Sequence, residues 1–226
     1  MNQGLIIFAR EPLPGKVKTR LGRAVGNNAA AELYGAMLAD VLEQAAALPG
    51  IRPLLYWACE GDGMPPSPDV PGLEVFRQAG ATLGQRMANA FESAFKSGSD
   101  VCCIIGTDSP DLPPEYISRA FDLLCQGEAD VVFGPAEDGG YYLLGMGRTW
   151  AGLFRDIPWG TPQVLAASLE RARHLGLRIA LLPQSYDIDT LSDLLRLLDS
   201  PGIRAARTRE AAHGVLKEAS RQQTGI

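Results

Sequence analysis

Short apolar runs alternate with longer helical patterns along this chain. Continuous apolar or β-branched runs predict strands at 4–9, 50–58, 73–78, 100–106, 129–135, 140–146 and 177–183. Apolar residues at helical spacing predict helices at 27–48, 82–97, 114–126, after 161–162 and at 190–200. Strands that alternate with helices indicate an α/β fold, with a mostly parallel sheet covered on both faces.

Turn-forming residues separate these elements. The stretch 60–72 holds four prolines and three glycines and is expected to be a surface loop. Thr161 and Pro162 are typical of an N-cap and the first residue of the helix that follows them. The segment from residue 201 onward is polar and rich in arginine, and its last residues are expected to fray.

Composition limits the classes of protein that fit. A chain of 226 residues with 46% hydrophobic content suits one compact domain, which we place at 1–200, with a C-terminal helix and tail at 201–226. The net charge of −5 argues against a nucleic-acid-binding surface. No apolar run approaches a membrane span and no signal peptide is evident, so we expect a cytoplasmic protein.

Cysteines and histidines do not form a recognisable motif. The four cysteines lack C-x-x-C spacing and are expected to be reduced core thiols. His174 and His213 fall on predicted helices, away from the polar loops. We therefore expect neither a zinc site nor a histidine-based triad.

The first loop concentrates positive charge in an acidic protein. In "FAREPLPGKVKTRLG", two prolines stiffen the backbone and Gly15 permits close approach of a ligand. Arg10, Lys16, Lys18 and Arg20 supply donors that suit phosphate oxygens. The loop lacks the first glycine and the Ser/Thr of a P-loop, and the chain has no G-x-G-x-x-G. It predicts a site for a small anionic ligand; the alternative is a solvated loop whose charges pair with neighbours.

Aspartates follow the most apolar strand and return late in the chain. Asp108 and Asp111 lie in "GTDSPDLPPE", at a carboxyl strand end where α/β sheets bind ligands. Carboxylates there suit Mg²⁺ or Mn²⁺. Asp108 is too early to cap the next helix and is predicted as a metal ligand, whereas Asp111 either caps that helix or contacts substrate. Thr190-x-x-Asp193 resembles a capping box, which leaves Asp189 free as a second metal ligand.

Two further loops offer substrate contacts. In "GPAEDGGYYLLG", Asp138 follows Glu137 and precedes Gly139 and Gly140. The segment is either a simple turn or a close-approach loop whose Asp138 acts as a base or contacts an acceptor. Trp159 precedes a helix and either packs as a core or lid residue or faces the acceptor.

The motifs "EPLPGKVKTRL", "GTDSPDLP", "GPAEDGGYYLLG", "PWGT" and "DIDTLSDL" together resemble a largely uncharacterised group of bacterial GT-A-like proteins, classed as nucleotide-diphospho-sugar transferases or glycosyltransferases. The wider superfamily includes molybdenum-cofactor and phospholactate guanylyltransferases. The resemblance covers residues 4–199 and implies a three-layer α/β/α sandwich with a mixed, mainly parallel sheet. It implies that Lys16, Lys18 and Arg20 bind nucleotide phosphates, and that Asp108 and Asp189 hold the metal. The glycine-rich loop of pyrophosphorylases is missing and the stiff cationic loop replaces it.

These observations predict a metal-dependent transferase that takes a nucleotide-sugar or a nucleoside triphosphate and a small-molecule acceptor. The missing glycine-rich loop favours a glycosyltransferase. The alternatives are a nucleotidyltransferase that releases pyrophosphate and a non-catalytic nucleotide-binding protein. Mg²⁺ or Mn²⁺ would neutralise the diphosphate leaving group, and the cationic loop would take the remaining charge.

Overall fold

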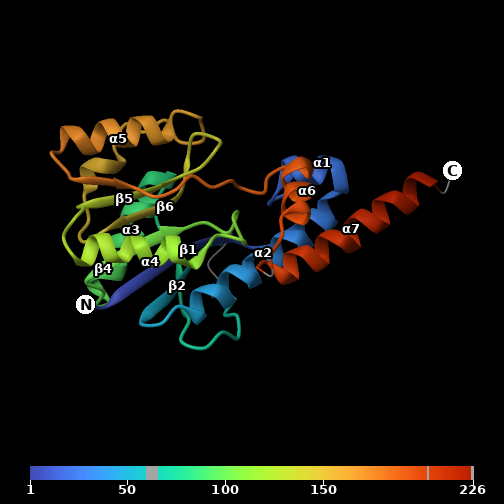
Figure 1. Cartoon of the computed structure of the whole chain (residues 1–226), viewed down its shortest axis with the longest axis horizontal. Coiled ribbons are helices and arrows are strands. Elements are labelled where there is room, and N and C mark those ends of the chain that lie inside the picture. Colours follow the sequence, from blue (N-terminus) through green and yellow to red (C-terminus); the bar gives the residue numbers. More distant parts are fainter. Residues whose placement is uncertain (60–65, 203, 225–226) are drawn as a thin grey trace.

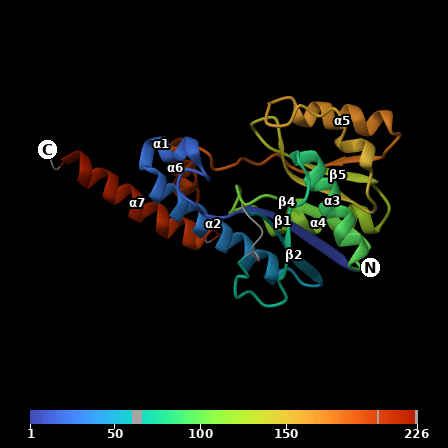
Figure 2. The same cartoon turned by 180° about the vertical axis from the view of Figure 1, so that it is seen from behind.

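A computed structural model describes residues 1–59, 66–202 and 204–224 of the chain. Figure 1 shows a body of strands and helices at the end that holds the N-terminus, and a cluster of helices at the other end, from which the C-terminal helix extends. Figure 2 shows the same two regions from behind. The strands are β1 (Gln3–Arg10), β2 (Ile51–Ala58), β3 (Glu74–Arg77), β4 (Val101–Ile105), β5 (Val131–Pro135), β6 (Tyr141–Met146) and β7 (Ile179–Leu181). The helices are α1 (Thr19–Val25), α2 (Asn27–Ala47), α3 (Leu83–Lys96), α4 (Pro114–Cys125), the 3₁₀ helix η1 (Ala151–Phe154), α5 (Val164–His174), α6 (Leu191–Asp199) and α7 (Ala206–Thr224).

The strands form one mixed sheet, which confirms the predicted α/β fold. Its order is β3-β2-β1-β4-β6-β5-β7, and only β6 runs antiparallel to its neighbours among the described strands. The fully buried strand β4 lies in the middle of the sheet. Its carboxyl end is therefore flanked by the carboxyl end of β1 and by the start of β6, where loops from distant parts of the chain meet.

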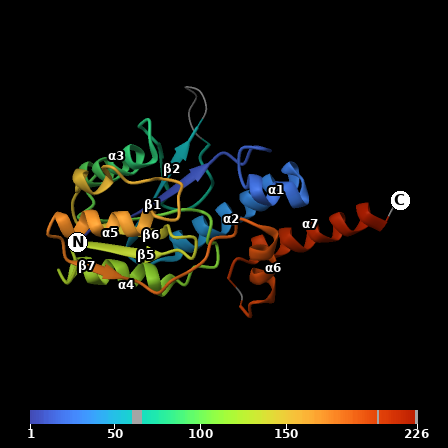
Figure 3. The ribbon, with the colours of Figure 1, turned by 90° about the horizontal axis from the view of Figure 1, so that it is seen from above.

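Alternate side chains of the strands build two separate cores. On one face, Ile7 of β1 and Cys103 of β4 pack with α2 and α4. On the other face, Ile6 and Ile104 pack with α3, η1 and α5. Figure 3 shows α3 and α4 on opposite sides of the strands. This period-2 alternation gives the three layers that the sequence predicts.

A third core holds the cluster of helices at the far end. Buried side chains of α1, the first half of α2, α6 and α7 form it, with Ile188 from the preceding loop. Asp40 of α2 is buried and accepts hydrogen bonds from the Thr208 backbone N–H and hydroxyl, at 2.8 and 2.7 Å. A carboxylate from another helix thus accepts a hydrogen bond from a backbone N–H group at the amino end of α7, which has no partner within that helix.

Several local expectations were wrong. Gln163, not Thr161, precedes α5, and the Leu165 N–H of the first turn donates to the Gly139 carbonyl at 2.9 Å, so a backbone group replaces the side-chain cap. Pro113 is the N-cap of α4, and no side chain caps that helix, so Asp111 is not its cap. The short helix α1 was not predicted, because its seven residues show no apolar periodicity of sufficient length.

The capping box of Thr190 and Asp193, in contrast, is confirmed.

Other parts of the chain agree with expectation or lie outside the described residues. Of the expected surface loop, 66–72 forms no helix or strand, and 60–65 lie outside the description, as do the terminal residues 225–226. Cys102 and Cys103 are buried free thiols, and Cys59 and Cys125 are half-buried free thiols. No helix in the described part of the chain combines the length and the apolarity that crossing a membrane requires.

One ion pair at the β5–β7 edge makes stability depend on pH. Arg178 donates to Asp130 through its backbone N–H, Nε and Nη2 at 2.8 to 3.0 Å, and these hydrogen bonds lower the pKa of Asp130 to about 2. A carboxylate whose pKa is lowered by folding stabilises the fold above its ordinary pKa, near 4, and loses that effect as the pH falls toward 2. Because the pair is partly exposed, we expect Asp130→Asn to lower the free energy of unfolding by about 1 kcal/mol at pH 7.

The difference between Asp130→Asn and the wild type should shrink by about half at pH 3. Urea unfolding at both pH values measures it. Asp156→Asn, at an exposed carboxylate beside Arg171, controls for the loss of one surface charge. An Asp130→Asn effect that is the same at both pH values would contradict this account.

Candidate active site

A cleft of about 1030 Å³ opens at the carboxyl ends of β1 and β4. The end of β1, residues 16–20, the start of α3, the loop after β4, the β5–β6 turn and the segment 159–164 all contribute to its walls. The opening thus lies at the sheet edge where α/β proteins bind their ligands. It contains most of the predicted site residues: Arg10, Lys16, Lys18, Arg20, Asp108, Asp138, Gly140, Trp159 and Asp189.

The cationic loop is held against the end of the sheet. The hydroxyl of Tyr34, on α2, accepts the Arg10 N–H at 2.8 Å and the Thr107 hydroxyl at 3.0 Å, so one side chain joins the ends of β1 and β4. The Lys16 N–H donates to the Leu13 carbonyl at 3.0 Å, which closes a turn. Gly15 has a positive φ in this turn but does not line the cleft. Gly15 therefore permits the turn of the loop and is not placed to contact a ligand in the cleft.

Lys18 lies at the centre of the site. Its backbone is in the left-handed region, with φ at +44°, and its side chain is only 3% exposed. The ammonium lies 2.5 Å from Asp108 Oδ1 and 3.0 Å from Asp189 Oδ1. Burial would lower the pKa of Lys18, but the two carboxylates outweigh it and the pKa lies above its ordinary value. Lys18 is therefore a buried cation that bridges both predicted metal ligands.

Two aspartates that are distant in sequence meet because their loops are tied together. Asp108 follows β4, and its carbonyl accepts the Ile188 N–H at 2.8 Å. Ile188 is fully buried in the core of the helical end, and the Thr190–Asp193 capping box fixes the next turn. Asp189 is thereby brought to face Asp108, with its Oδ2 also 3.7 Å from Arg20 Nη1.

The fit of the site to a divalent cation depends on the carboxylates that lie together there. Within the described residues, no group of three or more His, Cys, Asp or Glu side chains could hold a metal ion. Asp108 and Asp189, however, each place an oxygen on the same ammonium, and they remain 47% and 40% exposed. Mg²⁺ in nucleotide sites is commonly held by one or two carboxylates, with phosphates and water as its other ligands. The pair fits a cation of that kind.

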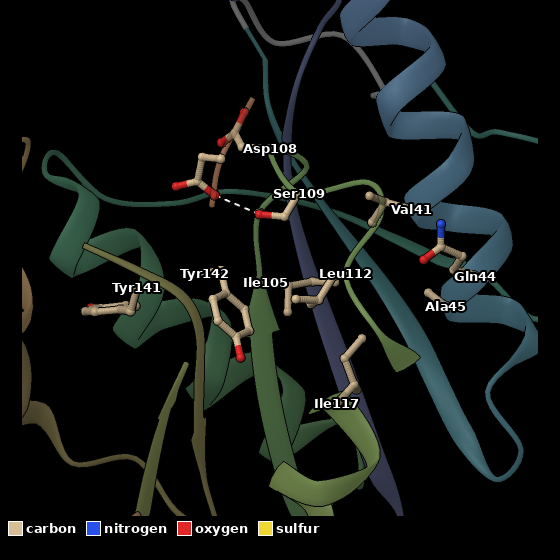
Figure 4. Close-up of a pocket in the computed structure, with 12 residues that line it drawn as sticks. Val41, Gln44, Ala45, Ile105, Asp108, Ser109, Leu112, Ile117, Tyr141 and Tyr142 are labelled. Atoms are coloured by element: carbon tan, nitrogen blue, oxygen red, sulfur yellow. Dashed lines mark hydrogen bonds between the residues drawn. The ribbon is translucent and has the colours of Figure 1, made fainter. Parts of the chain in front are cut away.

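Asp187 and Ser109 are polar neighbours to which the sequence analysis assigned no role. The Ser109 hydroxyl donates to Asp187 Oδ1 at 2.7 Å, drawn as a dashed line in Figure 4. Both line a small cavity of about 70 Å³ below Asp108, where Leu112 and Tyr142 also lie. Burial raises the pKa of Asp187 to about 6. The "DID" sequence could have indicated this placement, because Asp187 and Asp189 flank Ile188, which is fully buried.

The β5–β6 turn and the segment before α5 form the opposite wall of the cleft. Asp138 is exposed there, and its Oδ1 accepts the Gly140 N–H at 2.8 Å. Gly139 has φ at +90° and packs directly on the Pro162 carbonyl, so it holds the wall in place and does not line the cleft. Trp159 both lines the cleft and packs on Gly84 of α3 and on Tyr141.

Two acidic residues lie outside the cleft. Asp111, predicted as a substrate contact or helix cap, accepts a hydrogen bond from the Tyr186 hydroxyl at 3.0 Å and is not among the lining residues. Glu137 forms an ion pair with Arg196, at 2.7 and 2.9 Å. The structure therefore brings Asp138 into the cleft but leaves these two carboxylates away from it.

The fold is shared with solved structures of nucleotide-sugar transferases and nucleotidyltransferases. A solved structure from Desulfovibrio desulfuricans G20, described as a "putative nucleotide-diphospho-sugar transferase", is 32% identical, with a TM-score of 0.81 over 97% of this chain and 95% of that one. A Leptospira borgpetersenii cytidylyltransferase is 15% identical, with a TM-score of 0.53 over 99% and 96% of the two chains. A CMP:2-keto-3-deoxy-manno-octonic acid synthetase complexed with CTP is 16% identical, with a TM-score of 0.52 over 87% and 97%.

The chain belongs to the DUF2064 family, described as an uncharacterized protein conserved in bacteria, whose sequence profile matches residues 41–161. No curated protein matches it. The relative that is 32% identical places the chain among transferases, as the sequence predicts.

Proposed function

We propose that this protein is a metal-dependent glycosyltransferase that uses a nucleotide-sugar as donor. The observation that carries the proposal is the meeting of the cationic loop with Asp108 and Asp189 in one cleft at the carboxyl edge of the sheet. A diphosphate needs compensating positive charge where its bond to the sugar breaks. The relative that is 32% identical is described as a nucleotide-diphospho-sugar transferase, and this description supports the same substrate class.

Each side chain has a defined task in this proposal. The exposed Arg10, Lys16 and Arg20 face the cleft and bind phosphate oxygens of the donor. Asp108 and Asp189 would hold Mg²⁺ or Mn²⁺, which supplies Lewis-acid stabilisation of the departing diphosphate. On the facing wall, one Asp138 oxygen is held by the Gly140 N–H, which leaves the other to orient or deprotonate an acceptor hydroxyl. Trp159 offers an apolar surface to the acceptor.

One assay separates the proposal from its alternatives. Purified protein is incubated with Mn²⁺ and a panel of sugar nucleotides and nucleoside triphosphates, and the release of nucleoside diphosphate and of pyrophosphate is followed. We expect nucleoside diphosphate from at least one sugar nucleotide in the presence of an acceptor extract. Pyrophosphate release from a triphosphate would instead indicate a nucleotidyltransferase. Nucleotide binding without either product would indicate a binding protein.

The role of the loop is tested by Lys16→Ala. Lys16 is exposed on the cleft wall, so its removal should cost little stability. We expect the dissociation constant for a nucleoside diphosphate to rise about tenfold, because a charge-assisted phosphate contact contributes roughly 1.5 kcal/mol. The dissociation constant for the matching nucleoside should change less than about twofold. Calorimetric titration of both ligands measures the difference, and equal losses would exclude a phosphate contact.

A further inference from the structure

The ammonium of Lys18 is placed differently from the other cations of the loop. Arg10, Lys16 and Arg20 are exposed, whereas the Lys18 side chain is 3% exposed and lies behind the carboxylates of Asp108 and Asp189. A non-glycine residue rarely adopts a positive φ, and such strain is maintained only where the surroundings require it. Here the left-handed turn at Lys18 coincides with a side chain inserted between two acids.

This arrangement removes the net charge of the carboxylate pair. Lys18 and Arg20 carry two positive charges against the two negative charges of Asp108 and Asp189. A carboxylate pair attracts a divalent cation mainly through its negative charge, and a nearby cation repels it. The phosphates of a nucleotide would bring the missing negative charge to the same cleft.

We propose that the Lys18 ammonium is a built-in counter-cation for Asp108 and Asp189, so that this pair takes up a divalent cation only together with the phosphates of a nucleotide. Lys18 is thus a positioning residue and not a phosphate ligand. It holds the carboxylates together in the free protein and prevents them from binding a cation before the donor arrives. The part of the inference that concerns the nucleotide rests on the proposed function. The part that concerns Lys18 rests on the geometry of the site alone.

The first measurement is binding of Mn²⁺ to the wild-type protein, followed by electron paramagnetic resonance, with and without a nucleoside diphosphate. We expect Mn²⁺ to bind at least about tenfold more tightly to the protein when the diphosphate is present, after correction for the Mn²⁺–nucleotide complex in solution. If the protein binds the diphosphate, equal affinity for Mn²⁺ in the two conditions would overturn the proposal.

The second measurement compares variants with Mn²⁺ alone. Lys18→Met keeps the length of the side chain but removes its charge, so the uncompensated carboxylates should bind Mn²⁺ at least about tenfold more tightly than in the wild type. Lys18→Arg keeps the charge and should retain weak binding. Lys96→Met, at an exposed lysine paired with Glu92 on α3, controls for the loss of a surface charge. No gain in Lys18→Met would contradict the role of the ammonium.

The design keeps two failures apart. If the wild type binds no nucleoside diphosphate but Lys18→Met gains Mn²⁺ binding, the proposed function fails while the counter-cation role stands. If the wild type binds the diphosphate and Lys18→Met gains nothing, the counter-cation role fails alone. Should Lys18→Met not fold, Lys18→Gln removes the same charge with a polar side chain and must show the same gain.

Discussion

Asp108→Asn will lower turnover with Mn²⁺ and a nucleotide-activated donor at least about a hundredfold. The substitution removes one of two carboxylates that converge on a single point in the cleft. Electrostatic stabilisation of the leaving group by a held cation is worth several kcal/mol, and about 2.7 kcal/mol corresponds to a hundredfold in rate. Before a donor is identified, the same loss is expected in Mn²⁺-dependent binding of a nucleoside diphosphate.

The chain offers a matched control in the same loop. Asp111 follows the same strand, yet its carboxylate accepts the Tyr186 hydroxyl and does not line the cleft. Asp111→Asn should therefore keep turnover within about threefold of the wild type. Asp189→Asn should lower turnover as much as Asp108→Asn does. The double variant should lower it little further, because the effects of residues that act as a unit are not additive.

Asp108→Asn should remain folded, so the loss can be assigned to the site. Asp108 is 47% exposed, and Lys18 keeps Asp189 as its partner and can still donate to the amide oxygen. We expect a stability cost of about 1 kcal/mol, discounted for exposure. Turnover that survives in Asp108→Asn but falls in Asp111→Asn would contradict the placement of the site.

Gly139→Ala will destabilise the protein by about 2 to 5 kcal/mol and open the wall of the cleft that carries Trp159. A Cβ on Gly139 would overlap the Pro162 carbonyl oxygen and lie 2.8 Å from its carbonyl carbon. The φ of +90° adds strain for any residue with a Cβ. Left-handed backbone costs about 1–2 kcal/mol and overpacking about 1–3 kcal/mol more. Either the segment 159–164 moves away from Gly139, or the strain remains and lowers the free energy of unfolding.

Gly176→Ala separates the two contributions. Gly176 also has a positive φ, at +69°, but an added Cβ there would meet nothing within 4 Å. It should therefore cost only the backbone term, about 1–2 kcal/mol. Urea unfolding gives both values. The emission of Trp159 is the difference between a protein and its Trp159→Phe counterpart, and a change in this difference on Gly139→Ala reports whether the wall moves. Equal costs for the two glycines would show that the contact with Pro162 is not tight.

The fold was largely predictable because its strands are short, continuous apolar runs. Every predicted strand is present, and the alternation with helices indicated the layers correctly. The antiparallel insertion of β6 between β4 and β5 was not predictable, because pairing between strands depends on tertiary packing. The helix α1 escaped prediction since it begins inside the cationic loop, at a left-handed residue with no side-chain cap.

The position of a candidate site residue could be predicted where the sequence indicated no structural task for that residue. Asp108 came too early to cap a helix, and the capping box of Thr190 and Asp193 left Asp189 free; both line the cleft. The position of Asp111 outside the cleft could not be predicted, because its hydrogen bond with Tyr186 depends on a distant loop. The pairing of Lys18 with the two acids could not be predicted, because it depends on a backbone conformation that lysine seldom adopts.

A crystal structure of the wild-type protein with Mn²⁺ and a nucleoside diphosphate tests the central claim most directly. We predict an anomalous Mn²⁺ signal bound by Asp108 and Asp189, with the phosphates between this ion and the side chains of Lys16 and Arg20. Diphosphate bound elsewhere on the protein, or bound in the cleft without contact to either the ion or the cationic loop, would contradict the account.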